Sequence, residues 1–133
     1  MGQSMSKQTV GFVDLYEWGR WVRQDSDRLG YQSPWLLLMR NNVQISRTPA
    51  PAISDDEAMT IDAAVAKLAR HSLVLHRVLC YHYICGWSLR RIARAYLTPL
   101  EYGADSNKRV SVYAAQALLA RAEGFVHGTI ENG

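Results

Sequence analysis

Apolar positions recur every three or four residues along several stretches of the chain, and this spacing is typical of amphipathic helices. The clearest stretch begins at Ser54, where Ser54 and Glu57 have the spacing of a capping box and acidic residues occupy the first turn. The apolar positions behind this start are Ala58, Ile61, Ala64, Val65 and Leu68. The pattern predicts a helix over residues 55–70 with these side chains facing the core.

A second amphipathic stretch lies near the N-terminus, over residues 10–24. Its wide apolar and aromatic face consists of Phe12, Val13, Tyr16, Trp18, Trp21 and Val22. The segment from Gly30 to Trp35 ends this pattern. Pro49 and Pro51 exclude a regular helix between residues 41 and 53, because proline lacks a backbone N–H. We therefore expect residues 10–53 to form an N-terminal helix followed by an irregular connection.

Residues 71–97 have the pattern of two helices joined by a tight turn. Apolar positions continue from His71 to Ile84, and Gly86 can adopt the left-handed backbone that ends a helix. Ser88 can cap the next helix, whose inward positions are Leu89, Ile92, Ala93 and Tyr96. This arrangement is typical of a DNA-binding helix-turn-helix, in which one helix crosses the phosphate backbone and the following helix enters the major groove.

A last amphipathic helix is predicted from the apolar positions Val112, Ala115, Leu119, Ala122 and Val126. A minimal helix-turn-helix would have about three or four residues between Leu97 and this recognition helix, whereas residues 98–110 intervene. Two arrangements are open. Either Ser111 caps the recognition helix after a lengthened turn, or the helix starts earlier, at Ser106.

Together these patterns predict an all-α fold. We expect one small domain over residues 1–133, with residues 10–53 as its N-terminal part and residues 54–128 as a helical body. The helical body contains the helix-turn-helix, over about residues 71–126, with an insertion before the recognition helix. A chain of 133 residues and 15.0 kDa, of which 48% is hydrophobic, can supply one such core.

The charge is distributed unevenly along the chain, although its formal net value is only +3 and the pI is about 9.0. Residues 1–66 contain 6 basic and 8 acidic side chains, a net charge of −2. Residues 67–121 contain 9 basic and 2 acidic side chains, a net charge of +7. The positive charge is concentrated where the helix-turn-helix is predicted, as expected for a surface that binds a polyanion.

The candidate DNA contacts are Arg90, Arg91, Arg94, Lys108, Arg109, Tyr113 and Gln116. The three arginines on the helix after Ser88 fall outside its inward stripe, where they can face phosphates. The lysine and the last arginine directly precede the recognition helix. On the outward face of that helix, Gln116 can read an adenine edge. For Tyr113, packing against the inserted connection is an alternative to a DNA contact.

Metal and thiol chemistry have weaker support. Cys80 and Cys85 are about 140° apart around a helix, so they cannot face one another, and we expect buried reduced thiols. His76 and Cys80 lie one helical turn apart, but two ligands do not complete a tetrahedral zinc site and the chain has no Cys-x-x-Cys. A magnesium site of a nuclease can be imagined on Asp55, Asp56 and Asp62. Acids at a helix start are better explained as caps.

The sequence has no glycine-rich phosphate loop, no nucleophile elbow and no paired Ser or Cys with His. No apolar run approaches the roughly 20 residues needed to span a bilayer. The polar segment Gln3–Thr9 lacks the apolar centre of a signal peptide. We therefore expect a cytoplasmic protein that is not an enzyme, uses no cofactor or metal and does not bind a membrane.

The chain resembles the Q antitermination proteins of lambdoid phages, in the class that lacks the zinc-binding cysteine pairs. The matching stretches are EWGRWVR (17–23), LGYQSP (29–34), SDDEA (54–58), IDAAV (61–65), GWSLRRIA (86–93) and RAEGFV (121–126). The helix-turn-helix stretch alone is unspecific, since the DNA-binding regions of sigma factors and many repressors share it. The ordered combination is far more specific. Residues 98–110 depart from the compact form of the family.

The resemblance implies a late-gene antiterminator that binds a DNA element near the phage late promoter. It then engages paused host RNA polymerase holoenzyme and suppresses pausing and termination. Double-stranded DNA and the polymerase are the implied partners, and a pairing of protomers on DNA is left open. We assign the polymerase side to Trp18, Arg20, Trp21 and Arg23, because aromatic and Arg side chains anchor interfaces. The alternative is that the tryptophans fill the core.

Two other functions are compatible with the same residues. A simple helix-turn-helix DNA-binding protein, such as a repressor or the DNA-recognition subunit of a packaging machine, would explain the motif and the charge. A polymerase-binding adaptor without DNA contact would explain the N-terminal aromatic residues instead. The salt dependence of DNA binding distinguishes these functions, because a surface that neutralises phosphates loses affinity as salt rises.

Overall fold

The computed structural model describes residues 15–24 and 52–132, and these residues form helices without any strand. The expected all-α fold is therefore confirmed. Residues 15–24 form one helix, which we call the N-terminal helix. The others are α3 (Asp55–His71), α4 (Leu73–Tyr83), α5 (Leu89–Arg91), the π-helix η1 (Ile92–Leu97), α6 (Thr98–Tyr102) and α7 (Val112–Asn132). Phe12, Val13 and the connection up to residue 51 lie outside the described residues.

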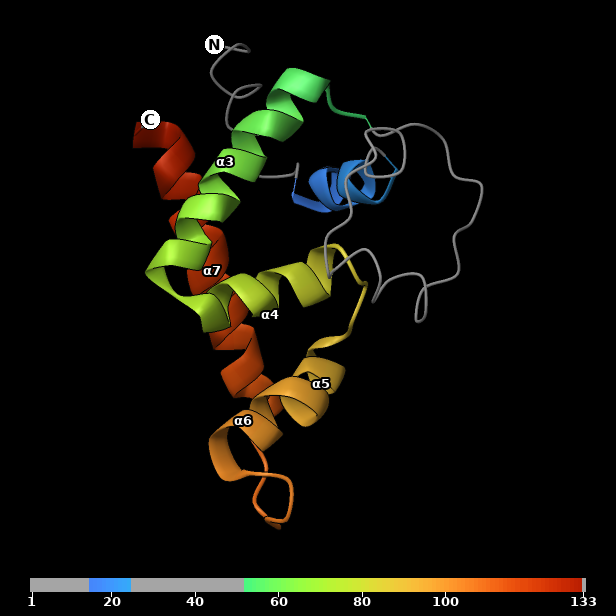
Figure 1. The fold of residues 1–133 in the computed structure, drawn as a ribbon, viewed down its shortest axis with the longest axis vertical. Helices are drawn as coiled ribbons and strands as arrows, with labels where there is room; N and C mark the ends of the chain where they lie inside the picture. Colours follow the sequence, from blue (N-terminus) through green and yellow to red (C-terminus); the bar gives the residue numbers. More distant parts are fainter. Residues whose placement is uncertain (1–14, 25–51, 133) are drawn as a thin grey trace.

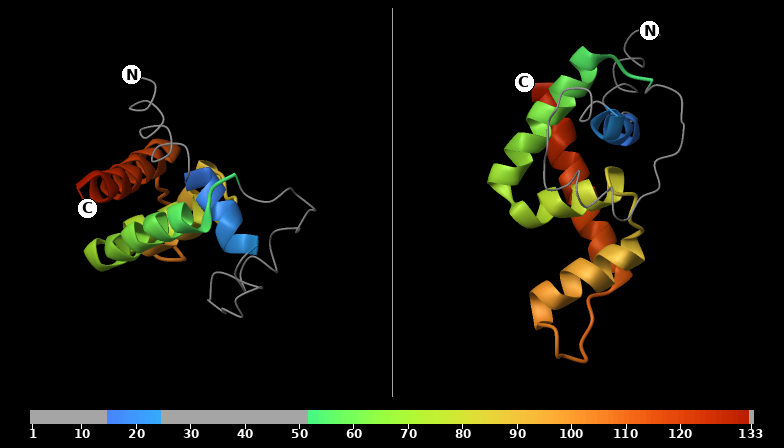
Figure 2. Two further views of the ribbon diagram at one scale, coloured as in Figure 1. Left: turned by 90° about the horizontal axis from the view of Figure 1, so that it is seen from above. Right: turned by 45° about the vertical axis from the view of Figure 1, so that its right-hand side comes forward.

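Helix α7 is the longest element and the one around which the others are arranged (Figures 1 and 2). It packs against α3, α4, α5 and η1. Helix α3 runs beside the C-terminal half of α7, α4 crosses it, and the α5–η1 segment lies along its N-terminal half. The largest fully buried side chains come from the N-terminal helix, α3, α4, η1 and α7, and include Trp18, Leu68, Val78, Leu79, Ile92 and Val126.

Helix α3 agrees with its predicted start and inward face. The Ser54 hydroxyl accepts a hydrogen bond from the Glu57 backbone N–H at 3.1 Å, and the Glu57 carboxylate accepts one from the Ser54 N–H at 2.9 Å. All five predicted apolar positions are buried. The capping box and the helical period are local signals, and both are realised here.

The predicted helix from His71 to Ile84 is divided from α3 at Ser72. Ser72 has an extended backbone (φ −156°, ψ 112°), its N–H donates to the Leu68 carbonyl, and its hydroxyl accepts from the Leu75 N–H. One serine therefore ends α3 and caps α4, because its side chain can replace a backbone partner. This break allows α4 to turn away from α3 and cross α7.

The helix that begins after Ser88 does not end at Leu97, as the sequence suggested, but continues through η1 and α6 to Tyr102. Pro99 has no N–H, and its ring would collide with the preceding turn of a regular α-helix. The wider π-turn of η1 lies directly before it, and the Thr98 N–H donates to the Ala93 carbonyl. The inserted connection is therefore shorter than expected and begins at Gly103, which has a positive φ of 84°.

The end of the inserted connection is anchored to η1. The Thr98 hydroxyl donates to the Ala93 carbonyl at 2.7 Å and accepts from the Val110 N–H at 2.9 Å. Ser111 then caps α7 through a 3.1 Å bond from the Ala114 N–H, so the start at Ser106 is wrong. Four of the five predicted inward positions of α7 are buried, whereas Val112, the first residue of the helix, is exposed.

The N-terminal helix lies against the C-terminal end of α4. At Gly19 a Cβ atom would be 2.0 Å from the Tyr83 carbonyl oxygen and 2.8 Å from its carbon. No side chain fits at such a distance from backbone atoms, so this approach requires glycine. Arg23 donates to the Ile84 carbonyl at 2.7 Å and to the Tyr83 carbonyl at 3.3 Å, and thereby supplies the last carbonyls of α4 with a partner.

Both cysteines are buried free thiols, as predicted. The Cys80 sulfur lies 3.5 Å from His76 Nε2. Burial raises the pKa of both thiols, to about 11 for Cys85, where Arg23 and Arg91 partly oppose the rise. The thiolate forms are therefore disfavoured in the folded protein.

Replacing Gly19 with alanine should destabilise the protein by about 1–3 kcal/mol, because the new methyl group has to displace backbone atoms. Gly124→Ala is the matched control. A Cβ at that exposed helical position meets nothing within 4 Å, so this change should stabilise the protein by about 0.5–1 kcal/mol. Urea unfolding followed by circular dichroism measures both changes. Equal free energies of unfolding for the two variants would contradict the close approach at Gly19.

The two thiols should react with a thiol reagent at pH 8 at least about tenfold more slowly in the folded than in the urea-unfolded protein, because the thiolate is the reactive form. The Cys80→Ser variant isolates Cys85, whose rate should keep rising up to a pH of about 11. Because folding raises this pKa from its ordinary value of 9.0, stability should fall as the pH rises between these values. A Cys85 rate that levels off near pH 9 would show an unperturbed thiol.

Candidate nucleic-acid interface

The turn between α4 and α5 is held by backbone and side-chain bonds. Gly86 has a φ of 74°, the left-handed conformation that the sequence suggested. The Trp87 N–H donates to the Tyr81 carbonyl at 2.9 Å, and the Trp87 carbonyl lies 2.9 Å from His82 Nδ1. The Ser88 hydroxyl accepts from the Arg91 N–H at 3.1 Å and caps the next helix, as predicted.

The inward face of the helix after this turn is close to the predicted one. Ile92 and Ala93 are almost completely buried, and Leu89 and Tyr96 are half-buried. Leu97 is also buried and, four residues after Ala93, it extends the same inward stripe. This face is anchored on α7 and α4.

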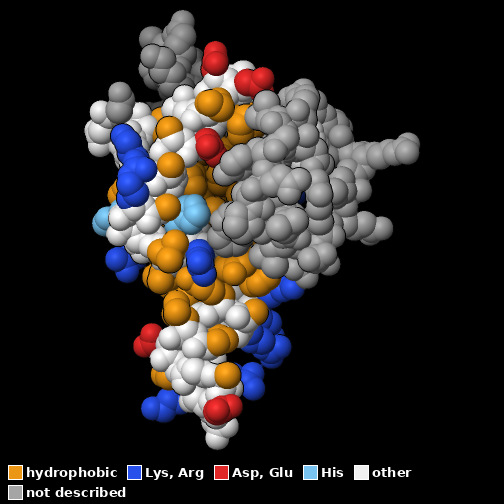
Figure 3. All heavy atoms as spheres, in the orientation of Figure 1, with side chains coloured by type: hydrophobic (Ala, Val, Ile, Leu, Met, Phe, Trp, Pro, Cys, Tyr) orange, Lys and Arg blue, Asp and Glu red, His pale blue; other side chains and the backbone are white. Residues whose placement is uncertain are grey.

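Arg90, Arg91 and Arg94 are all exposed on the outer side of this helix, as predicted. Figure 3 shows Lys and Arg side chains gathered along the right-hand edge of the narrow lower part of the molecule, over α5 and η1. None of the three arginines forms an ion pair with an acidic side chain of residues 15–24 or 52–132. Their positive charge is therefore available to an external anion.

The connection before α7 adds two more exposed cations, Lys108 and Arg109. The Lys108 N–H donates to the Ser106 hydroxyl at 3.1 Å, and the Lys108 ammonium lies 5.9 Å from the centre of the Tyr102 ring. At 82% exposed, Tyr113 does not pack against this connection. Gln116 is exposed one turn further along α7. Both candidate DNA contacts of α7 are therefore exposed to solvent near the start of the helix.

One contact at this surface was not found from the sequence. The Tyr81 and Trp87 rings stack with centroids 4.1 Å apart and an angle of 12° between their planes. The Arg91 guanidinium carbon lies 4.3 Å from the Trp87 ring centre. The sequence contains one signal for this contact, because the aromatic residue Trp87 stands four positions before the outward Arg91.

The N-terminal residues that we assigned to a partner surface are largely internal. Trp18 and Trp21 are 1% and 9% exposed and belong to the core, so they do not form a surface anchor. Their indole N–H groups donate to acids of α3, Trp18 to Asp62 at 3.4 Å and Trp21 to Asp55 at 2.9 Å. A buried indole needs such an acceptor, and α3 supplies one at its start, Asp55, and one two turns later, Asp62.

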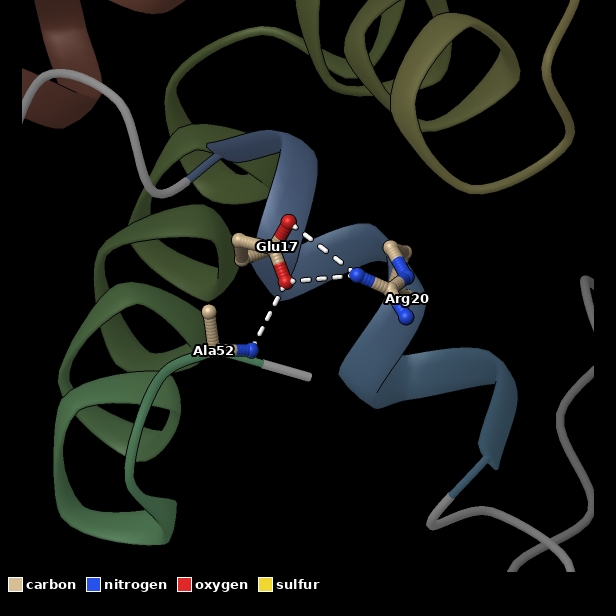
Figure 4. A network of polar contacts seen from close by, with 3 residues as sticks. All are labelled: Glu17, Arg20 and Ala52. Atoms are coloured by element: carbon tan, nitrogen blue, oxygen red, sulfur yellow. Dashed lines mark hydrogen bonds and ion pairs between the residues drawn. The ribbon is translucent and has the colours of Figure 1, made fainter. Parts of the chain in front are cut away.

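Arg20 and Arg23 are half-buried rather than freely exposed. Arg20 forms an ion pair with Glu17 at 3.0 Å, and the same carboxylate accepts the Ala52 N–H at 2.8 Å (Figure 4). This network fastens the segment before α3 to the N-terminal helix. Arg23 is engaged with the end of α4. These two arginines therefore have structural partners, and a role toward another protein would be additional.

The two metal hypotheses have the following geometry. Asp55 and Asp62 each accept an indole N–H. His76 and Cys80 do approach one another, but burial lowers the pKa of the imidazole and raises that of the thiol. In the described ranges, no three His, Cys, Asp or Glu side chains are grouped closely enough to hold a metal ion. Likewise, none of the described helices is long and apolar enough to cross a membrane.

Comparison with known proteins assigns the chain to a family. The family model of phage antitermination protein Q matches residues 13–132, almost the whole chain. No curated protein and no solved structure shows significant similarity to it. The matched range includes the N-terminal helix and every element from α3 to α7. The chain therefore belongs to the phage antitermination protein Q family and is a phage transcription antiterminator.

Proposed function

We propose that this antiterminator binds duplex DNA near the phage late promoter and loads onto host RNA polymerase holoenzyme paused there, so that the enzyme passes later pauses and terminators. The observation that supports DNA binding most directly is the row of exposed arginines on α5 and η1, none of which forms an ion pair with an acid in the part of the chain that the structure describes. Arg90, Arg91 and Arg94 project from a helix whose opposite face is firmly packed. The packed face holds the helix backbone in place, so the arginine side chains can meet phosphates without a rearrangement of the helix itself.

The proposed DNA surface is a helix-turn-helix with an inserted connection. In this arrangement α5 and η1 cross the phosphate backbone, and the first turns of α7 enter the major groove. The exposed side chains of Tyr113 and Gln116 then face base edges. Lys108 and Arg109 approach the phosphates beside the groove. The Ser111 cap fixes the start of α7 and therefore the height of these side chains in the groove.

The proposed polymerase surface is the outer side of the N-terminal helix. Trp18 and Trp21 hold this helix on α3. Tyr16 is 61% exposed, and Arg20 and Arg23 retain part of their surface. A helix fastened by two indole bonds is a rigid element on which a large partner can dock.

Transcription of a late-promoter template followed by an intrinsic terminator tests the function as a whole. With host RNA polymerase holoenzyme and this protein, we expect read-through that requires the promoter-proximal DNA. A template without that DNA is the control. Unchanged termination together with specific DNA retardation would instead indicate a repressor or a packaging subunit. Read-through without any DNA retardation would indicate an adaptor.

Replacing Arg90 and Arg94 together with alanine should weaken DNA binding and reduce the salt slope of log K by about 1.8, because about 0.9 is lost for each phosphate contact. Lys67→Ala with Arg70→Ala removes the same charge from the exposed side of α3 and should leave the slope almost unchanged. Fluorescence anisotropy with a labelled duplex measures both. If the two double variants behave alike, α5 and η1 do not contact DNA.

Gln116→Ala should reduce binding to the specific DNA element by about 1–3 kcal/mol, because a bidentate contact to a base is lost. Binding to a random-sequence duplex should hardly change, and this comparison is the internal control. Competition assays with the two duplexes measure the ratio. An equal loss on both would mean that Gln116 contacts the backbone or supports the fold instead of reading a base.

A further inference from the structure

We propose that the stacked pair of Tyr81 and Trp87 positions the guanidinium of Arg91 for a DNA phosphate, and that Arg91 is therefore the strongest phosphate contact of the three outward arginines. This inference rests on the proposed DNA surface. It ranks Arg91 above Arg90 and Arg94, which the sequence alone does not do. It also gives Tyr81 and Trp87 a role in positioning a DNA contact.

The aromatic platform is itself held in place. Trp87 is only 9% exposed, and its ring stacks on Tyr81, which in turn contacts Tyr96 at a centroid distance of 5.3 Å. The Trp87 backbone is bonded on both sides, its N–H to the Tyr81 carbonyl and its carbonyl to the His82 ring. The indole therefore has little freedom to move when a ligand binds beside it.

Arg91 is held at two points. Its backbone N–H donates to the Ser88 cap, and its guanidinium carbon lies 4.3 Å from the Trp87 ring centre. For Arg90 and Arg94, no hydrogen bond, ion pair or ring contact of the side chain occurs within the described part of the chain. All three side chains are exposed, so a phosphate can reach each of them. They differ in how firmly the structure holds the guanidinium in one position.

Stacking is compatible with phosphate binding because the two use different parts of the guanidinium. The flat face packs on the indole, while the N–H groups around the edge remain able to form paired hydrogen bonds with phosphate oxygens. A flexible arginine loses side-chain entropy when it binds, whereas Arg91 is already ordered. The contact to DNA is therefore stronger for the same charge.

The choice of tryptophan at this position supports the same role. The Trp87 indole N–H is buried and has no hydrogen-bond partner in the described residues, which is unfavourable. A phenylalanine or leucine would avoid that cost. Among side chains, however, tryptophan offers the best ring face for a cation. At position 87 the protein thus has a buried N–H that lacks a hydrogen-bond partner in the described residues, together with the aromatic ring that binds a cation most strongly.

The experiment measures binding of the full-length protein to a fluorescein-labelled random-sequence duplex of about 30 base pairs, at several salt concentrations between about 50 and 200 mM. Arg91→Lys keeps the charge but loses the planar stacking group. We expect it to weaken binding about five- to tenfold with little change in the salt slope. The matched controls Arg90→Lys and Arg94→Lys should each change binding less than about twofold.

The platform is tested by Trp87→Leu, which should reproduce the loss of Arg91→Lys. The double variant should be no weaker than either single one, because both changes remove the same interaction. Trp87→Phe should restore most of the affinity, since it keeps an aromatic face. A merely structural role of Trp87 would instead give additive losses. Circular dichroism identifies any variant that does not fold. If a Trp87 variant is unfolded, the binding of Arg91→Lys, a substitution at an exposed position, tests the inference by itself.

The outcomes separate this inference from the proposed function. If Arg91→Lys binds like the two control variants, Arg91 has no special place, and the inference is overturned while DNA binding by the surface stands. If the triple variant Arg90→Ala, Arg91→Ala, Arg94→Ala binds the duplex as the unchanged protein does, the proposed DNA surface is wrong, and the inference fails with it. Loss in Arg91→Lys with non-additivity supports both.

Discussion

Small buried side chains on α7 are the feature on which the rest of the structure depends. Ala115, Ala122 and Val126 are completely buried on the helix that α3, α4, α5 and η1 all contact. An alanine lets a neighbouring helix approach the backbone, so that several helices can pack around one axis. The helix with the outward arginines packs on the same helix that presents Tyr113 and Gln116. Their relative orientation is therefore set by this packing and not by the connection between them.

Acidic and basic side chains are used in different ways in this fold. The acids of α3 satisfy donors of the N-terminal helix and of the helix start, and Glu123 on α7 accepts the hydroxyl of Tyr83, whose pKa is raised by burial and by this bond. The arginines of α5 and η1 have no acidic partner in the described residues. Several acids thus serve internal donors, while the positive charge of α5 and η1 stays on the surface, as the proposed DNA binding requires.

The sequence-based predictions agree with the structure where the physical signal acts between residues close together in the chain. The capping box at Ser54, the left-handed Gly86 and the cap at Ser88 act within a few residues, and all three are present as predicted. The exposure of the arginines follows from helical period alone. The cap that Ser72 forms between α3 and α4 and the continuation beyond Leu97 were not predicted. Serine is tolerated inside helices, and the wide turn before Pro99 has no local sequence signature strong enough to read.

The sequence by itself determined the helical character of the chain, the starts of its main helices and the concentration of positive charge after residue 66, because each depends on neighbours within one or two turns. Only the tertiary structure decided that both N-terminal tryptophans are internal and that Trp87 lies under Arg91. Trp21 meets Asp55 across 34 residues and Trp18 meets Asp62 across 44. An aromatic residue on an amphipathic helix suits a core or an interface equally well, and the choice depends on which distant acceptors and helices the fold brings beside it.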